Sequence, residues 1–416
     1  MTLKIRSVIV RADQIRWNTE ECDQVSANNA IGVAGDFAAQ SVIRLFLTIT
    51  NFEIGGSERQ FSVLAQNVRP SKFQLHLGCV SRKGPLGIDF ADIPQFRLGG
   101  SLYGWTSLGS RLKLSRYLRE NKVQVAHAFD FYVNLTLIPA ARLARVPVVI
   151  GSHRQLGDVM TAAQFRTQAW ALRWCDAVAC NSHAAAGRLE EAGLQHEKLA
   201  VIGNALPAEV FEPATPALPA RPGALRVGMV ARMNAHSKNH AGFLRIAAEI
   251  DRLRPETEFL LVGDGPLRPE LERQAAELGL SRRVLFLGDR REIPAILASI
   301  DVAVLTSISE SLSNAILEAM AARLPVVAYN VGGNRELLNE QRGALIPVGN
   351  EDEFAAAVVR LLSNGNLRAE RGANARRFVE ENFSLDRVRK QYEDLYTRLL
   401  SEKIAKRIFF RRSFAA

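Results

Sequence analysis

Residues 301–320 read DVAVLTSISESLSNAILEAM and contain, in order, a strand, a loop and the start of a helix. The apolar run 301–306 is typical of a buried strand. Ser313 is a favourable N-cap residue, so we expect a helix to begin there and to carry Glu318 in its second turn. A buried strand that leads directly into a helix is the building unit of parallel sheets covered by helices on both faces.

The same unit recurs along most of the chain. Short β-branched runs alternate with amphipathic stretches such as 270–278, whose apolar residues repeat near the helical period. This alternation predicts an α/β fold with two Rossmann-like, doubly wound domains. The twelve candidate strands are 42–50, 73–80, 123–127, 147–151, 176–180, 199–203, 226–231, 258–263, 283–288, 301–306, 325–330 and 344–347.

Proline marks the boundary between the two domains. Residues 207–222 hold five prolines and little apolar periodicity, which predicts a linker. We therefore expect an N-terminal domain at 41–206 and a C-terminal domain at 223–383. Ser384 can cap a last helix over 384–400, and because no strand follows it, that helix must pack on structure already formed.

Composition limits the class of protein. The 416 residues are 47% hydrophobic and 23% charged, which excludes a disordered, collagen-like or coiled-coil chain. The four cysteines follow no zinc spacing, and their scarcity fits a reducing compartment. The most apolar stretch, 131–151, contains Arg142 and Arg145, so we expect no membrane span. Residues 1–40 lack the apolar core of a secretory signal, and we expect a poorly ordered extension there and a cytoplasmic protein.

The net charge of +10 comes mostly from arginine. Such an excess favours anionic partners, namely nucleic acid, an anionic membrane surface or phosphorylated ligands. The sequence has no zinc-finger, RRM or basic-zipper pattern, so we expect no nucleic-acid partner.

Candidate ligand contacts follow the strands, because ligands of doubly wound sheets bind beyond the carboxyl ends of the strands. Gly55 and Gly56 follow the first strand, and adjacent glycines let backbone N–H groups approach an anion; the alternative is a tight turn with no ligand. In the second half, Arg232 and Lys238 follow the strand 226–231. Their guanidinium and ammonium groups could clamp a diphosphate, or they could be solvated loop cations.

The loop and helix quoted first carry the most specific pattern. Glu310 falls in the loop at the ligand-binding edge, and Glu318 lies on the helix. Free N–H groups at Leu312, Ser313 and Asn314 would point at the same place and could hold a phosphate. Carboxylates on either side of that phosphate would accept hydrogen bonds from sugar hydroxyls. The alternative is that both glutamates are ordinary polar residues of a loop and a helix.

Taken together, the motifs resemble those of family 4 (GT4) retaining glycosyltransferases of the GT-B fold. The resemblance rests on the E-x7-E pair in ESLSNAILEAMA and the PVV and GGNRE that follow it, with GGSER, ARMNAHSKNH and LLVGDGPLRPEL earlier in the chain. It covers about residues 43–400, with the motifs in the family's order and spacing. It implies two domains facing a cleft, a nucleotide-sugar donor on the C-terminal domain, an acceptor on the N-terminal domain, and a last helix that returns to the N-terminal domain.

The resemblance also implies roles for individual residues. Arg232 and Lys238 would hold the donor diphosphate and stabilise the leaving group. Glu310 would contact the hydroxyls of the donor sugar, and Glu318 the ribose. The other expected donor contacts come from the glycine turn of the first domain, the loop that contacts the base, and the helix N-terminus: Gly55, Gly56, Gly288, Asp289, Arg290, Leu312, Ser313 and Asn314.

A histidine completes the active site that the resemblance implies. The family often has His-x-His after the strand that 123–127 represents, but here the sequence is His127-Ala128-Phe129, so the second histidine is absent. We expect His127 to be the catalytic histidine on the acceptor side, with His153, after the next strand, as a second candidate. For each of them the alternative is a structural role.

The implied reaction moves a hexose from a UDP- or GDP-sugar to a hydroxyl with retention at the anomeric carbon. The sequence has no Asp-x-Asp motif, so we expect no metal or other cofactor to be required. One alternative is a nicotinamide dehydrogenase, although the GxGxxG fingerprint is missing. Another is a catalytically inactive nucleotide-sugar-binding protein or scaffold of the same fold.

Basic residues alternate with apolar ones in the tail 401–416 and in the stretch 111–122. Such segments suit docking on an anionic membrane surface, and the alternative is a solvated helix face with a frayed tail. We therefore expect a peripheral enzyme on the inner face of the cytoplasmic membrane. Its acceptor would be lipid-linked or a growing surface polysaccharide or glycolipid.

Overall fold

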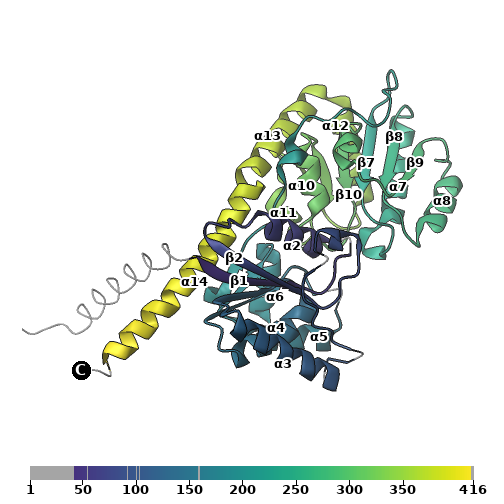
Figure 1. The fold of residues 1–416 in the computed structure, drawn as a ribbon. Helices are drawn as coiled ribbons and strands as arrows, with labels where there is room; N and C mark the ends of the chain where they lie inside the picture. Colours follow the sequence, from purple (N-terminus) through teal and green to yellow (C-terminus); the bar gives the residue numbers. More distant parts are fainter. Residues whose placement is uncertain are drawn as a thin grey trace, which may run out of the picture.

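The computed structural model describes residues 42–413 except 54, 91, 100, 103, 158 and 159. The expected extension at 1–40 and residues 414–416 lie outside the described residues. The described chain forms two α/β domains, and the long helix α14 (Leu385–Ser413) runs from one along the other (Figure 1).

The N-terminal domain is built on a six-stranded parallel sheet with the strand order β2-β1-β3-β4-β5-β6. Its strands are β1 (Ile43–Ile49), β2 (Phe73–Cys79), β3 (Val125–Ala128), β4 (Val148–His153), β5 (Ala177–Cys180) and β6 (Leu199–Val201). Its helices are α2 (Gly56–Asn67), α3 (Trp105–Glu120), α4 (Phe131–Leu143), α5 (Ala162–Leu172) and α6 (His183–Glu191), with short 3-10 helices η1 (Pro85–Phe90) and η2 (His196–Lys198).

The C-terminal domain has a second six-stranded parallel sheet, ordered β12-β11-β10-β7-β8-β9. Its strands are β7 (Arg226–Val230), β8 (Glu258–Val262), β9 (Val284–Gly288), β10 (Val302–Leu305), β11 (Val326–Tyr329) and β12 (Gly343–Ile346). Its helices are η4 (His236–Lys238), α7 (His240–Leu253), α8 (Arg268–Glu277), α9 (Ile293–Leu297), α10 (Asn314–Ala321), α11 (Asn334–Leu337), α12 (Glu351–Ser363) and α13 (Gly365–Phe383), and η3 (Ala208–Phe211) lies in the connection between the domains.

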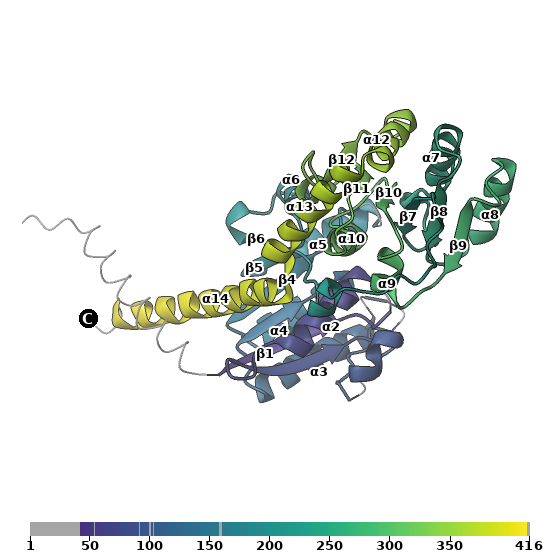
Figure 2. The same ribbon diagram turned by 90° about the horizontal axis from the view of Figure 1, so that it is seen from above.

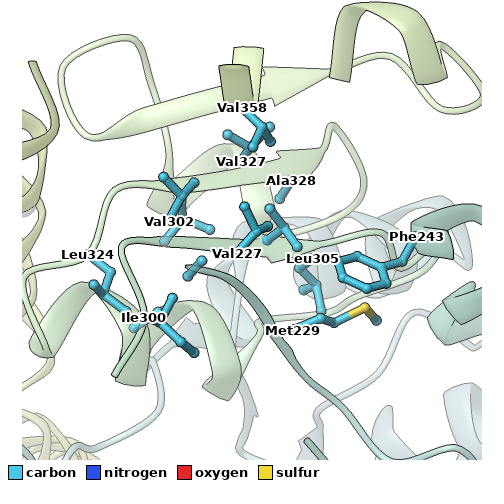
Figure 3. Packing of buried hydrophobic residues seen from close by; sticks show 14 of the residues in the cluster. Val227, Met229, Phe243, Ile300, Val302, Leu305, Leu324, Val327, Ala328 and Val358 are labelled. Atoms are coloured by element: carbon cyan, nitrogen blue, oxygen red, sulfur yellow. The ribbon is translucent and has the colours of Figure 1, made fainter. Parts of the chain in front are cut away.

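All twelve predicted strands are present, and each observed end lies within two residues of the predicted one. The prediction of a doubly wound α/β fold is therefore confirmed. The strands could be located because they are buried on both faces and read as continuous apolar runs. Figure 3 shows this in the C-terminal domain, where Val227 and Met229 of β7 pack with Val302 and Leu305 of β10. Each such side chain contributes about 1.5–3 kcal/mol when fully buried.

The two connections between the domains lie side by side. The N–H of Leu206, just before the proline-rich segment, donates to the carbonyl of Phe383 at 2.8 Å, and the carbonyl of Leu206 accepts from the N–H of Leu385 at 3.0 Å. The chain thus leaves the N-terminal domain and returns to it at the same place.

Helix α14 completes the core of the N-terminal domain. Val388, Tyr392, Tyr396 and Leu399 are buried at helical spacing and pack in the same cluster as Ile43 of β1. The helix is longer than the predicted 384–400, because no glycine or proline stops it, and it continues through most of the expected tail to Ser413. Figure 2 shows its last turns extending beyond the sheet of the N-terminal domain. None of the helices among the described residues is both long and apolar enough to cross a membrane.

Candidate active site

Two loops of the C-terminal domain bring Lys238 and Glu310 together. The first follows β7 and the second follows β10, and these strands are neighbours in the sheet. The loops are joined by hydrogen bonds from Ile308 N–H to the Ser237 carbonyl, 2.8 Å, and from the Thr306 hydroxyl to the Asn239 carbonyl, 2.9 Å. The Lys238 ammonium nitrogen lies 2.6 Å from a carboxylate oxygen of Glu310, which is mostly buried. A fixed cation beside a carboxylate, at the carboxyl edge of the sheet, can contact a phosphate and a sugar hydroxyl at once.

Helix α10 begins as predicted. The Ser313 hydroxyl caps it by accepting a hydrogen bond from Ile316 N–H at 3.3 Å. Leu312 and Ser313 are buried, and Asn314 opens the helix facing the N-terminal domain. The unpaired N–H groups of this first turn carry the positive end of the helix dipole.

Gly332 and Gly333 hold the loop that carries Glu310. The Gly333 N–H donates to the Glu310 carbonyl at 3.1 Å. A Cβ on Gly332 would lie 1.9 Å from the Glu310 carbonyl oxygen, and one on Gly333 would lie 1.9 Å from that of Ser311. No side chain fits at either position. The sequence contained this glycine pair in GGNRE, but no role followed from it, because the contact depends on the tertiary arrangement.

The glycine turn of the N-terminal domain faces α10. A Cβ on Gly56 would lie 3.4 Å from the Asn314 amide nitrogen. Across the same gap, the Arg59 guanidinium lies 3.3 Å from a carboxylate oxygen of Glu318. A Cβ on Gly55 would meet only the carboxylate of Glu58, at 2.2 Å, and that flexible side chain can move aside.

A cavity of about 1020 Å³ lies between the domains at this point. Helix α2 and the linker form one wall, and α9 and α10 form the other. Its lining includes Arg59, Phe211, Arg290, Asn314 and Glu318. Burial raises the pKa of Glu318, and the nearby Arg59 guanidinium opposes that rise. Three of the expected donor contacts, Arg290, Asn314 and Glu318, therefore line a space of the size that holds a drug-sized ligand.

Arg232 and Gly288 lie on adjoining loops of the same domain. Gly263 has a φ of 127°, and its Cβ would lie 2.3 Å from the Ala231 carbonyl oxygen, so the loop after β8 packs directly on the segment that carries Arg232. The Gly263 N–H donates to the Gly288 carbonyl at 2.9 Å. The Asp289 carboxylate accepts from Asp264 N–H at 3.0 Å and fixes the loop that leads to Arg290.

The sequence matches known families over most of its length. Residues 54–210 match the family described as Glycosyltransferase Family 4, and residues 224–364 match Glycosyl transferases group 1. The chain is a family 4 glycosyltransferase of the GT-B fold. The expectation drawn from its motifs is confirmed.

Individual relatives with similar sequences are also glycosyltransferases. The chain is 29% identical to the UDP-Gal:alpha-D-GlcNAc-diphosphoundecaprenol alpha-1,3-galactosyltransferase of Escherichia coli, over 71% of this chain and 80% of that one. It is 28% identical to the lipopolysaccharide core biosynthesis glycosyltransferase LpsE of Rhizobium meliloti, over 60% and 69%. The crystal structure of Anabaena HepE in complex with UDP superposes with a TM-score of 0.74 at 22% identity, over 85% of this chain and 99% of that one, which shows a shared fold.

In this glycosyltransferase His127 does not lie at the cleft, which corrects the prediction that it is the catalytic histidine. It is fully buried beneath α14, with one ring nitrogen 2.8 Å from the Tyr396 hydroxyl and the other 2.8 Å from the Ser152 hydroxyl. Burial lowers the pKa of His127 to about 3, so the ring is neutral. With both nitrogens hydrogen-bonded inside the protein, neither is available to a substrate.

His153 is also a core residue rather than one exposed to the acceptor side. It is fully buried, its ring centroid lies 5.7 Å from that of Phe165 with the two rings tilted, and one ring nitrogen lies 3.5 Å from the Gln168 amide. Burial lowers the pKa of His153 to about 4. The second candidate for the acceptor-side histidine is therefore not supported either.

Two residues at the cleft were not predicted from the sequence. Asn204 donates to the Leu312 carbonyl at 3.3 Å and to the Asn314 amide oxygen at 2.6 Å, so it fixes the N-terminus of α10 from the other domain. Arg154 in turn donates to Asn204 at 2.6 Å. No sequence signal marks either residue. Among the residues that the structure describes, no three His, Cys, Asp or Glu side chains are grouped as a metal site.

The buried His127 makes stability depend on pH. The unfolded chain binds a proton near the usual pKa of 6.5, whereas the folded chain does so only near 3, so the stabilisation present above 6.5 is lost as the pH falls. We expect His127 to lower the free energy of unfolding by up to about 1.4 kcal/mol for each pH unit between 6.5 and about 3. Urea unfolding at several pH values should therefore show that the free energy of unfolding falls less steeply with decreasing pH in His127→Gln than in the wild type. Equal slopes, or a variant that folds normally but has lost transfer, would contradict the structural role.

Proposed function

We propose that this glycosyltransferase moves a hexose from a nucleoside diphosphate sugar to a hydroxyl acceptor, with retention and without a required metal ion. The observation that carries the proposal is the pairing of Lys238 with Glu310, 2.6 Å apart, next to the capped N-terminus of α10. Residues 223–383 would be the donor domain, and 41–206 with α14 the acceptor domain.

The electrostatics of the cleft support diphosphate departure as the step that the protein assists. As the bond to the sugar breaks, negative charge develops on the leaving diphosphate. Arg232, Lys238 and the N–H groups of α10 would surround that charge and stabilise it more in the transition state than in the ground state. These groups would supply the positive charge that a metal ion could otherwise provide, which is why we propose a metal-independent reaction.

The carboxylates would orient the donor. Glu310 would accept hydrogen bonds from the sugar hydroxyls, and its pairing with Lys238 keeps its charge in place. Glu318, at the wall of the cavity, would accept from the ribose, with Arg290 beside the base. Retention would follow from attack by the acceptor on the face from which the diphosphate leaves.

For the donor base we favour uracil over guanine. The Escherichia coli relative is named for UDP-Gal, and HepE has been crystallised with UDP and with UDP-glucose. The same comparisons favour a lipid-linked or surface-polysaccharide acceptor, because one relative acts on a diphosphoundecaprenol-linked sugar and another takes part in lipopolysaccharide core synthesis. Such an acceptor would place the enzyme on the inner face of the cytoplasmic membrane.

Thermal unfolding with added nucleotides tests this proposal. UDP at 100 times its dissociation constant should stabilise the fold by about 2.7 kcal/mol and raise Tm, with or without magnesium. GDP, ADP and NAD are the comparison ligands. The effect of UDP should be much weaker in Glu318→Ala and intact in Glu340→Ala, an exposed glutamate outside the cavity lining.

Three results would overturn parts of the proposal. A response to NAD alone would contradict a sugar nucleotide donor. A response to UDP only with magnesium would contradict metal independence. Binding of UDP-sugars without turnover on any acceptor would indicate an inactive member of the family.

A further inference from the structure

Helix α3 carries an apolar stripe on its outer face. Its inner face is formed by residues such as Leu114 and Leu118, which are buried against the domain. On the opposite side, Trp105, Leu108 and Leu112 are exposed, and Trp105 keeps 88% of its surface accessible. Their spacing of three and four residues places them on one side of the helix.

The stripe continues onto the two neighbouring helices. Trp170 of α5 and Trp174 just after it are 61% and 58% exposed, with ring centroids 6.1 Å apart. On α4, Tyr132 and Leu143 are exposed as well. All three tryptophans among the described residues are thus on this helical layer, and none is in the core.

The three helices form one continuous layer on the outside of the N-terminal domain (Figure 1). Hydrogen bonds from arginines join them: Arg111 of α3 donates to the Leu135 carbonyl of α4 at 3.2 Å, and Arg142 of α4 donates to the Trp174 carbonyl at 2.8 Å. The exposed aromatic and aliphatic groups therefore belong to a single surface, which we call the α3–α5 face.

The charge of the α3–α5 face is strongly one-sided. Within the three helices the sole acidic residue is Glu120, at the end of α3. The basic residues of these helices and of the turns that follow them are Arg111, Lys113, Arg116, Arg119, Lys122, Arg142, Arg145, Arg166 and Arg173, and the turns add a single acidic residue, Asp176.

Helix α14 adds to this charge at one edge. Lys403 lies 2.6 Å from Asp176, which also pairs with Arg142 at 3.0 Å. The last turns of α14, with exposed Lys406 and Arg407, therefore begin beside the α3–α5 face. Both acidic oxygens of Asp176 are engaged, so the edge presents a net positive charge.

We propose that the α3–α5 face docks this protein on an anionic lipid bilayer. Tryptophan and leucine partition into the headgroup and upper acyl region, while arginine and lysine pair with lipid phosphates. A protein partner would need an acidic surface to match nine basic residues, whereas an anionic leaflet supplies that charge without further requirement.

The placement fits a lipid-linked acceptor, and in this respect the inference rests on the proposed function. Helix α4 begins directly after β3, so Tyr132 lies at the carboxyl edge of the sheet, on the side of the cleft. Leu143 lies at the far end of the same helix. The face therefore reaches from the cleft entrance outward, and a membrane under it would lie within reach of the acceptor domain.

Co-sedimentation with vesicles tests the proposal on the full chain. The wild type should sediment with vesicles of phosphatidylcholine and phosphatidylglycerol, and much less with phosphatidylcholine alone. The double variant Trp170→Ser/Trp174→Ser should have a water-to-vesicle partition coefficient at least tenfold lower than that of the wild type. Lys113→Ala with Arg116→Ala should lower it about fivefold per residue removed, on anionic vesicles only. The matched controls, Leu253→Ser and Arg282→Ala, alter exposed residues of the other domain and should change nothing.

Several outcomes would overturn the inference. One is no sedimentation of the wild type with either vesicle. Another is that the tryptophan and the Lys113/Arg116 double variants, which we call the patch variants, sediment like the wild type while the double variant Lys406→Ala/Arg407→Ala does not. This result would assign docking to α14 alone. A third is concentration-dependent dimerisation, abolished by the tryptophan changes, without vesicle binding. Stabilisation by UDP should be unaffected in the patch variants, so failure of docking can be separated from failure of the proposed donor site.

Discussion

Replacing Lys238 or Glu310 by alanine is expected to lower kcat/KM for sugar transfer by about 10²–10³, while leaving the fold intact. The magnitude is that for removing one preorganised group that stabilises a developing charge. Lys238 is about one-third exposed and Glu310 lies in a loop, so neither change leaves a large hole in the core. The alanine variants should therefore unfold at nearly the wild-type Tm.

Because the two side chains contact each other, their effects should not add. The double variant should lose little more activity than the worse single variant, as is usual for residues that act as a unit. Lys72→Ala, which removes an exposed lysine of the other domain, is the matched control and should keep full activity. If both single variants turned over at near-normal rates, the assignment of this pair to the donor site would be wrong.

Placing alanine at Gly332 or Gly333 is the second change from which we expect a large effect. Either Cβ would lie 1.9 Å from a carbonyl oxygen of the loop that carries Glu310, so that loop must move. Gly332 also has a φ of 44°, a left-handed conformation that costs alanine additional free energy. We expect a loss of about 1–3 kcal/mol in the free energy of unfolding from the clash alone. A displacement of about 1 Å at Glu310 should cost roughly 100-fold in transfer rate.

A glycine in open space provides the comparison. A Cβ on Gly187, in α6, would meet no atom within 4 Å, so Gly187→Ala should be neutral or stabilise the helix by up to about 1 kcal/mol. Measuring Tm and kcat for the three variants separates a steric effect on the loop from a general effect of removing glycine. Normal turnover in Gly333→Ala would show that the position of Glu310 is not held by this contact.

The sequence predicted those features that depend on local pattern. Buried parallel strands read as apolar runs, and the capping serine of α10 stands where the apolar period begins, so both were located closely. Lys238 and Glu310 lie together because both follow neighbouring strands of one sheet, and their roles at the donor stay a prediction.

The errors have a common physical cause. His127 was placed at the acceptor side because the family that the motifs resemble has a histidine after this strand, but the hydroxyl of Tyr396, 269 residues further on, fills the space beside it. The packing of α14 on β3 and β4 cannot be read from either segment alone. In the same way, Asn204 reaches α10 from the other domain, and no local pattern marks a residue that acts across an interface.

The return of α14 to the first domain has a consequence for synthesis. A ribosome releases the strands and helices of the N-terminal domain first, but the buried side chains Tyr392 and Tyr396 that close its core emerge only after the C-terminal domain. Until then, the sheet face around Ile43 is covered only in part, by α2, and the partly made domain exposes apolar surface of the kind that chaperones bind. The domain that is made first is therefore completed only after the second one.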